Sequence, residues 1–250
     1  MKTQWDYTAL ADAYLERPDY APEALAELFS IAGISKGAHV CDIGAGVGHL
    51  AIPLAEAGFL VDAVEPNDAM RANGIKRTAN LRGISWSEGT GEATGRPSGE
   101  YDYVSFGSSF NVCDREKALQ ETHRLLKPGR WFCCLWNHRN LDDPVQAAIE
   151  GIIQAVVPEY DYGTRREDQS GVIEASGLFV DVRYVEGSVS HTQTVDKIVE
   201  AWRSHATLQR QAQDKFAAVV AGIEDYLRTL SKDGVVIPYT TRAWTAKRKD

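Results

Sequence analysis

The sequence lacks several features that would assign it to a broad class of proteins. No apolar run approaches the length of a membrane span, and the start MKTQWDYTAL lacks the apolar segment of a signal peptide. Basic residues do not predominate, with 27 Lys and Arg against 35 Asp and Glu, and the basic run that stands out is residues 247–249. We therefore expect a cytoplasmic protein that binds neither membrane nor nucleic acid.

Cysteine is also scarce, and its four positions show no metal-type spacing, so no metal site is predicted. Cys41 and the pair Cys133–Cys134 fall in predicted strands. We expect free, buried thiols in a reducing compartment. At 250 residues the chain is near the upper size for one domain and long enough to bury a sizeable core.

A glycine-rich turn lies between two short apolar runs. Val40–Ile43 and Phe59–Val64 have the β-branched bias of buried strands. Between them lie the glycines Gly44, Gly46 and Gly48, followed by apolar residues at the spacing of a helix. Glycine lets the backbone approach a ligand closely, and the helix that follows offers free N–H groups to negative charge. Glu65 follows about twenty residues past the turn, where a carboxylate can accept hydrogen bonds from ribose hydroxyls.

The turn differs from the dinucleotide fingerprint G-x-G-x-x-G. Its glycines fall as G-A-G-V-G, and His49 occupies the third glycine position of the fingerprint. Asp42 precedes the turn at the end of the strand. A carboxylate there would repel a pyrophosphate and attract an ammonium group. The pattern therefore disfavours NAD.

Asp42 lies before the glycine turn and Glu65 after the second strand. With both acidic residues at these positions, the stretch resembles motif I of the class I methyltransferases, which bind S-adenosylmethionine (SAM). The segment AYLERPDYAPEAL, residues 13–25, resembles the subgroup often called type 11. Residues 89–93, 101–104 and 125–129 are similar to the family's G-x-A-E loop, F-D-x-V strand and L-L-K-P-G turn, with Gly91 in place of the usual Ala. The resemblance covers residues 10–137 and thins beyond them.

The resemblance implies the residues that hold SAM. The turn would support its amino-acid part and Glu65 its ribose. Asn111 stands where many relatives have histidine, so no general base is implied at that position. The implied cofactor-binding residues are Asp42, Gly44, Ala45, Gly46, Gly48, Glu65, Pro66, Asn67, Met70, Gly91, Glu92, Phe106, Gly107, Ser108 and Asn111.

Alternating strands and helices predict an α/β fold with a doubly wound, mostly parallel sheet. The resemblance adds that the sheet has seven strands and that the last one is antiparallel. We expect one structural unit, with a helical cover over residues 1–32 and an α/β domain over residues 33–250. A two-helix insertion is predicted near residues 195–230, and strands at 131–136, 178–185 and 235–246. Pro238 indicates an edge or a bulge in the last strand.

Aromatic and basic residues outside motif I are candidates for a cover over the ligand. An aromatic ring gains about 2 kcal/mol or more against a desolvated cation such as a sulfonium. Packing on the core explains the aromatic residues equally well. The candidates are Tyr7, Tyr14, Arg17, Tyr20, Trp136, Tyr162, Arg203 and His205.

Trp136–Arg139 ends the fifth strand at the edge where open α/β sheets bind ligands. His138 is the first candidate for a general base, although a lone histidine is more often structural. Asn137 is a neutral group that can orient an amine or a carboxylate. Arg139 is expected at the surface, paired with Asp142 or Asp143.

Three functions remain open. The main one is a SAM-dependent methyltransferase that acts on a small molecule. A second is an enzyme of the same fold for which SAM is the sole substrate, releasing methylthioadenosine and a small cyclic amino acid. A third is a non-catalytic SAM-binding protein. The sequence does not indicate the oligomeric state.

Overall fold

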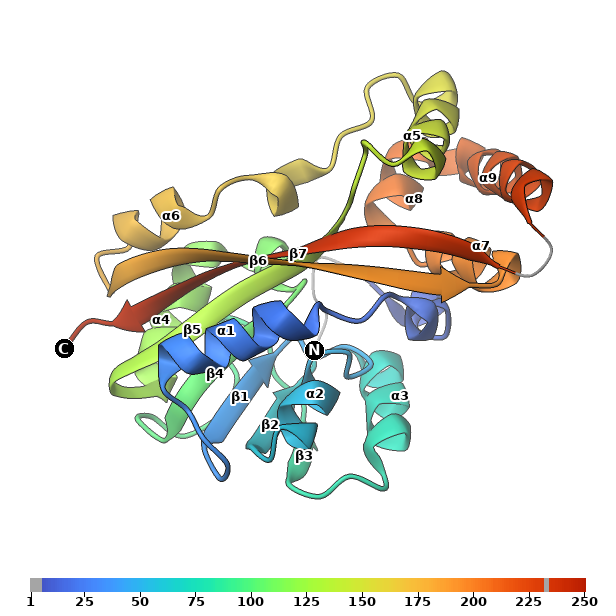
Figure 1. The fold of residues 1–250 in the computed structure, drawn as a ribbon. Coiled ribbons are helices and arrows are strands. Elements are labelled where there is room, and N and C mark those ends of the chain that lie inside the picture. Colours follow the sequence, from blue (N-terminus) through green and yellow to red (C-terminus); the bar gives the residue numbers. More distant parts are fainter. Residues whose placement is uncertain (1–5, 232–233) are drawn as a thin grey trace.

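The computed structural model describes residues 6–231 and 234–250, and Figure 1 shows their arrangement. The strands are β1 (His39–Ile43), β2 (Leu60–Val64), β3 (Ile84–Ser87), β4 (Tyr101–Gly107), β5 (Leu126–Arg139), β6 (Phe179–Gln193) and β7 (Val235–Arg248). The α-helices are α1 (Pro22–Ala32), α2 (Ala51–Glu56), α3 (Asp68–Thr78), α4 (Arg115–Leu125), α5 (Pro144–Val156), α6 (Ser170–Ala175), α7 (Val195–Arg203), α8 (Ala206–Ala212) and α9 (Phe216–Leu230). Short 3-10 helices are η1 (Thr8–Leu10), η2 (Ala13–Glu16), η3 (Phe110–Val112), η4 (Gly163–Arg166) and η5 (Gln213–Lys215).

The strands form one sheet in the order β3-β2-β1-β4-β5-β7-β6. Neighbours from β3 to β5 are parallel, and β7 is antiparallel to both β5 and β6. The predicted α/β fold, with its antiparallel last strand, is confirmed. Pro238 lies beyond the end of β5 and pairs with β6 alone, so its missing N–H disrupts no ladder there.

The central strands β1 and β4 are buried on both faces because helices cover each side of the sheet there. Val40 belongs to a core cluster that includes residues of α1 and α2. Its neighbours Cys41 and Ile43 belong to the cluster on the other face, which includes residues of α4. This alternation is the period of a strand. All four cysteines are free thiols, and Cys41, Cys133 and Cys134 are buried.

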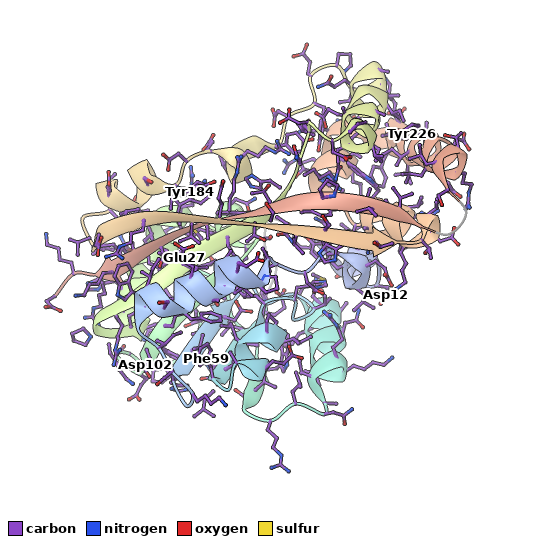
Figure 2. All side chains as sticks on the ribbon, viewed as in Figure 1. Asp12, Glu27, Phe59, Asp102, Tyr184 and Tyr226 are labelled. Carbon is purple, nitrogen blue, oxygen red and sulfur yellow. The ribbon has the colours of Figure 1, made fainter. Side chains whose placement is uncertain are left out.

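The helices α5, α7, α8 and α9 pack around a third core cluster, which we call the helical lobe. Figure 1 shows it at one end of the sheet. Figure 2 shows Tyr226 in this lobe and Asp102 at the opposite end of the molecule, where β4 begins. The carboxyl ends of β1, β2 and β4 therefore point towards the lobe. Within the described residues, no helix is both long and apolar enough to cross a membrane.

Three predicted elements differ from the structure. Residues 8–16 form two short 3-10 helices where a longer helix was expected, and Arg17 is extended because Pro18 follows it. The region 195–230 holds three α-helices, since His205 Nδ1 accepts the Leu208 N–H and starts an extra one, α8. Strand β6 continues to Gln193 because β7 pairs with it along that whole length.

Candidate functional site

A cavity of about 600 Å³ lies at the carboxyl ends of β1, β2, β4 and β5, the edge where open α/β sheets bind ligands. Its floor is formed by residues of segments 42–50, 65–70, 90–92 and 107–114. Its roof is formed by residues of segments 7–20, 136–139 and 201–207 together with Tyr239. The size is that of a small-molecule site, which spans about 300–1,000 Å³.

The glycine turn at the floor has the backbone that only glycine adopts easily. Gly44 and Gly46 have φ of 66° and 57°. A Cβ on Gly44 would lie 2.5 Å from Ser109 Cβ, and one on Gly46 would lie 3.3 Å from Met70 Cε. The N–H groups of Gly44 and Ala45 donate to the carbonyl of Val64, at 2.8 and 3.0 Å. The turn is therefore held against the end of β2 and is closed to a side chain at Gly44.

Glu65 is positioned by the backbone around it. Its two carboxylate oxygens accept the N–H groups of Gly46, at 2.8 Å, and Asn67, at 2.9 Å. Arg71 donates to the Glu65 carbonyl at 2.7 Å. Burial raises the pKa of the Glu65 carboxyl, whose residue is 6% exposed. Each oxygen keeps a further lone pair for a donor in the cavity, such as a ribose hydroxyl.

Asp42 is a buried carboxyl at the end of β1. Its Oδ1 accepts a hydrogen bond from Ser105 Oγ at 2.8 Å. Its Oδ2 is buried and has no hydrogen-bond partner among the described residues. Burial raises the pKa of this carboxyl to about 7. A cationic group in the cavity would favour its ionised form, so the floor fits a ligand with a positive charge.

The raised pKa of Asp42 predicts a pH-dependent stability. The folded protein keeps this proton up to about pH 7, whereas the unfolded chain releases it near 3.8. The stabilising contribution is thus complete below about pH 4 and is lost as the pH rises through about 7. The Asp42→Asn variant has no such proton to lose. The difference in unfolding free energy between this variant and the parent protein should therefore shift by about 2–3 kcal/mol in favour of the variant when the pH is raised from about 5 to about 8.

Urea unfolding at both pH values measures that change. Asp102→Asn is the control. The hydrogen bond from the His39 N–H, together with Lys127 and Arg130, lowers the pKa of Asp102 and keeps it out of this pH window. A stability difference for Asp42→Asn that stays constant with pH would contradict the assignment.

The roof is tied to the floor and to the helical lobe by hydrogen bonds. Arg17 donates from Nε to Ser204 Oγ at 2.7 Å and from Nη2 to the Ser204 carbonyl at 2.8 Å. On the other side, His49 Nε2 donates to the carbonyl of Tyr14 at 2.9 Å. These bonds bring together residues 14–17, His49 and Ser204, which are distant in the sequence.

Aromatic side chains line the roof. The rings of Tyr7 and Tyr14 meet edge to face at 5.7 Å. Trp136 Nε1 donates to Asn111 Oδ1 at 2.8 Å, so Asn111 positions an indole that faces the cavity. Burial raises the pKa of both Tyr7 and Tyr20, so these phenols stay neutral. Neutral aromatic walls suit a cationic ligand.

The end of β4 holds a strained residue. Ser108 has φ of 59°, and its N–H donates to the Leu135 carbonyl at 2.8 Å. Its hydroxyl lies 3.0 Å from the hydroxyl of Tyr20. A Cβ on Gly107 would lie 3.0 Å from that same Tyr20 oxygen. Non-glycine residues in this conformation gather at functional sites. Here the contact between the Ser108 and Tyr20 hydroxyls connects the end of β4 to the roof.

Asn137 lines the cavity, but its amide is already hydrogen-bonded. Its Nδ2 donates to the carbonyls of Pro18, at 3.0 Å, and Asp19, at 2.8 Å. Its Oδ1 accepts from Thr241 Oγ1 at 2.6 Å. These bonds hold the roof segment 18–19 against β5 and β7. The side chain of Asn137 therefore positions the roof over the cavity.

The comparison with known sequences agrees with this geometry. Residues 40–129 match the sequence model of a methyltransferase domain family. An uncharacterized methyltransferase of Mycobacterium bovis is 33% identical over 128 residues, 50% of this chain and 48% of that protein. A ubiquinone/menaquinone biosynthesis C-methyltransferase of Rubrivivax gelatinosus is 34% identical over 107 residues, 42% of this chain and 41% of that protein. Residues 40–129 of this chain are therefore similar to methyltransferases in sequence.

The match spans about half, or less, of the length of these relatives. A solved structure extends the likeness of the fold to almost the whole chain. It is phosphoethanolamine N-methyltransferase 2 of Haemonchus contortus, with a TM-score of 0.58 and 18% identity. The alignment covers 99% of this chain and 58% of that one. The class I methyltransferase fold therefore includes β6 and β7.

Most of the predicted site residues meet in this cavity. Those on the floor are Asp42, Gly44, Ala45, Gly46, Glu65, Pro66, Asn67, Met70, Gly91, Glu92, Gly107, Ser108 and Asn111. Those in the roof are Tyr7, Tyr14, Arg17, Tyr20, Trp136, Asn137 and His205. Gly91 replaces the family's usual alanine because a Cβ there would lie 2.4 Å from Cys113 Sγ.

Five predicted site residues lie elsewhere. Gly48 packs against Trp86 and Phe106 against Phe110. The hydroxyl of Tyr162 donates to the carboxylate of Glu150 in the helical lobe. The other two are His138, buried outside the cavity lining, and Arg203.

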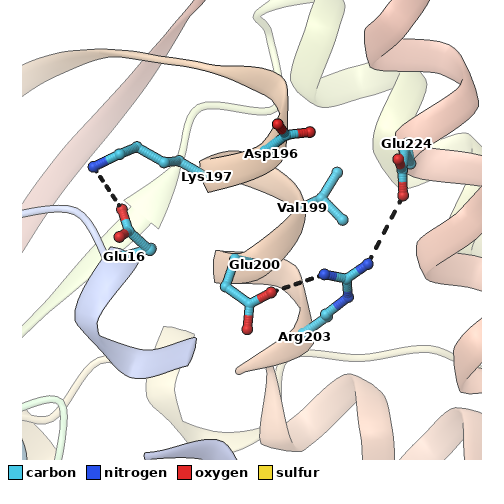
Figure 3. Close-up of a pocket in the computed structure, with 7 residues that line it drawn as sticks. All are labelled: Glu16, Asp196, Lys197, Val199, Glu200, Arg203 and Glu224. Atoms are coloured by element: carbon cyan, nitrogen blue, oxygen red, sulfur yellow. Dashed lines mark hydrogen bonds and ion pairs between the residues drawn. The ribbon is translucent and has the colours of Figure 1, made fainter. Parts of the chain in front are cut away.

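Arg203 lines a second, smaller pocket of about 320 Å³ between η2, α7 and α9 (Figure 3). It pairs there with Glu200 at 2.8 Å and with Glu224 at 3.9 Å. On the other side of this pocket, Lys197 pairs with Glu16 at 3.1 Å. Each of these charged side chains pairs with another one of the set, so this pocket offers a ligand fewer unpaired groups than the larger cavity does.

Sequence reasoning missed several lining residues because distant segments bring them together. His49 was read only as a departure from a fingerprint, yet it fastens the roof. Arg139 was expected to pair with Asp142 or Asp143, but its guanidinium lies 3.5 Å from the centre of the Trp202 ring and lines the cavity. The others are Pro18, Val47, Leu50, Thr90, Ser109, Val112, Cys113, Asp114, Ala201, Ala206, Thr207 and Tyr239.

Proposed function

We propose that this protein binds SAM in the cavity and transfers its methyl group to a small-molecule acceptor. One observation carries the proposal: two carboxylates, Asp42 and Glu65, flank a glycine turn that is closed to side chains, all in one cavity. SAM carries an ammonium, a sulfonium and a ribose, which these groups match. The family relationship supports the same ligand.

The protein contributes position and electrostatics to such a reaction, since SAM supplies an activated methyl group. Asp42 would face the ammonium group, and Glu65 would accept hydrogen bonds from the ribose. Burial beneath the roof removes water, which strengthens both interactions. Tyr7, Tyr14 and Trp136 give the roof aromatic surface towards the positive charge.

General-base catalysis has little support in the cavity. His205 is the histidine of the roof lining, and its Nδ1 accepts the Leu208 N–H at 3.2 Å. In the neutral ring the proton therefore sits on Nε2, which makes that nitrogen a donor. His138, the first candidate from sequence, is 2% exposed and outside the lining. Positioning of an acceptor that is already nucleophilic accounts best for the chemistry.

Calorimetric titration tests ligand identity. SAM and S-adenosylhomocysteine should bind, and NAD should not. Affinity for SAM should rise from about pH 5 to about pH 8, because the ligand's positive charge favours ionised Asp42, whose pKa is about 7 in the free protein. Binding of NAD with no response to SAM would refute the proposal.

Product analysis tests the reaction. The protein is incubated with SAM alone and with SAM plus a small-molecule extract, and the nucleoside product is identified by mass spectrometry. S-adenosylhomocysteine that forms only with extract supports methyl transfer. Methylthioadenosine without extract would instead indicate that SAM is the sole substrate, and binding without turnover would indicate a non-catalytic SAM-binding protein.

A further inference from the structure

The charges that line the cavity are divided between its two halves. The floor contains the carboxyl groups of Asp42, Glu65, Glu92 and Asp114. Among the described lining residues, no Lys or Arg belongs to the floor and no Asp or Glu belongs to the roof. The roof instead contains Arg17 and Arg139. The negative half matches the ammonium and sulfonium groups of SAM. SAM has a single carboxylate, and the roof has two arginines, so one of them is left to the acceptor.

Arg139 is held firmly at the last position of β5. Its backbone pairs with Tyr239 of β7, and its carbonyl accepts a hydrogen bond from Arg166 Nη2 at 3.2 Å. Its guanidinium carbon lies 3.5 Å from the centre of the ring of Trp202, a residue that is 2% exposed. A guanidinium fixed on a buried indole loses little further freedom when it binds a ligand.

The two arginines of the roof differ in their partners. Arg17 uses its Nε and Nη2 donors on Ser204. The guanidinium of Arg139 forms no ion pair or hydrogen bond with the residues that the structure describes; its contact there is with Trp202. The nearby carboxylate of Glu150 accepts from Tyr162 instead. Arg139 thus presents donors towards the cavity with the charge uncompensated.

A second lining residue contacts the same indole. The ring of His205 stacks on Trp202 with centroids 5.3 Å apart, so Arg139 and His205 contact the same indole. Both residues line the cavity. The neutral His205 ring carries its proton on Nε2, because Nδ1 accepts the Leu208 N–H. Paired N–H donors, one of them charged, recognise oxyanions.

We propose that the acceptor is a small acid and that Arg139 binds its carboxylate or phosphate group, with His205 as an additional donor. This inference rests on the proposed function, since it assigns a ligand to the part of the cavity that bound SAM would leave unoccupied. An anionic group held at Arg139 orients the acceptor, and the roof excludes basic acceptors by charge. Arg139 is then a specificity residue and takes no part in moving the methyl group.

The test is a calorimetric titration of the full chain saturated with S-adenosylhomocysteine. The probes are benzoate, phenyl phosphate and the neutral benzamide. We expect an acid to bind more tightly than benzamide, and the better of the two acids identifies the oxyanion. Arg139→Gln should weaken binding of that acid at least about tenfold, the effect of losing a charged hydrogen bond, and leave benzamide unaffected.

Arg203→Gln is the matched control. It removes a guanidinium from α7, the helix that carries Trp202, but one that lines the other pocket (Figure 3). It should bind the probes as the parent protein does, and both variants should keep their affinity for S-adenosylhomocysteine. The inference is overturned if neither acid binds to the parent protein or if benzamide binds as tightly as the acids do. It is also overturned if Arg139→Gln binds the acid as tightly as the parent protein does. Failure of the parent protein to bind S-adenosylhomocysteine would refute the proposed function instead.

Discussion

Gly44→Ala is expected to lower the unfolding free energy by about 2–5 kcal/mol. An L residue in the left-handed region costs about 1–2 kcal/mol, and forcing extra atoms into a packed site costs about 1–3 kcal/mol more. Both costs apply, because Gly44 has φ of 66° and its Cβ would lie 2.5 Å from Ser109 Cβ. Ser109 cannot turn aside easily, since its hydroxyl donates to the Ile43 carbonyl at 2.5 Å. Urea unfolding measures the loss.

Gly33→Ala separates the two costs. Gly33 has φ of 61°, close to that of Gly44, and no atom lies within 4 Å of the Cβ it would gain. It should lose only the backbone part, about 1–2 kcal/mol. Equal losses in the two variants would show that the contact with Ser109 contributes nothing. Removing that contact, with Ser109→Gly in the Gly44→Ala background, should recover part of the stability.

Glu65→Ala is expected to weaken the binding of S-adenosylhomocysteine by about 1.5–3 kcal/mol, which is about 10- to 150-fold. The variant loses the carboxylate that would hold the ribose. It also loses the acceptor for the Gly46 N–H at 2.8 Å and for the Asn67 N–H at 2.9 Å, so the turn itself becomes less ordered. Calorimetric titration at constant pH gives the affinity directly.

Glu121→Ala controls for the general effect of removing a buried carboxylate. Glu121 is 9% exposed, accepts hydrogen bonds from Thr94 and Arg124, and does not line the cavity. That variant should lose stability and keep its affinity. An affinity of Glu65→Ala equal to that of the parent protein would mean that Glu65 only supports the turn.

Local chemistry explains which parts of the site could be predicted. From Asp42 to Glu65, each step is set by neighbours in the chain: a buried strand, a turn that needs glycine, a capped helix and a second strand. The ends of these strands reach the same edge of the sheet whatever the rest of the chain does. This part of the floor could therefore be predicted from the order of residues, and the resemblance added Gly91, Glu92, Gly107, Ser108 and Asn111.

The arrangement of the roof could not be derived in this way, although several of its residues were candidates, because they meet only through tertiary contacts. Arg139 reaches the cavity because Trp202, from a distant helix, lies beneath its guanidinium. His138 and Arg139 are adjacent in sequence, yet Arg139 lines the cavity and His138 does not. Strand alternation predicts such a division but not which side faces the ligand, since that depends on where the helical lobe packs.

The two halves of the cavity also differ in how they can diverge during evolution. The floor lies within one contiguous stretch, residues 42–114, and the family match at 40–129 contains all of it. The roof is assembled from segments that precede and follow that stretch. Duplicated genes can therefore exchange or extend the late segments, and so acquire a new acceptor, while the inherited stretch continues to hold the same cofactor.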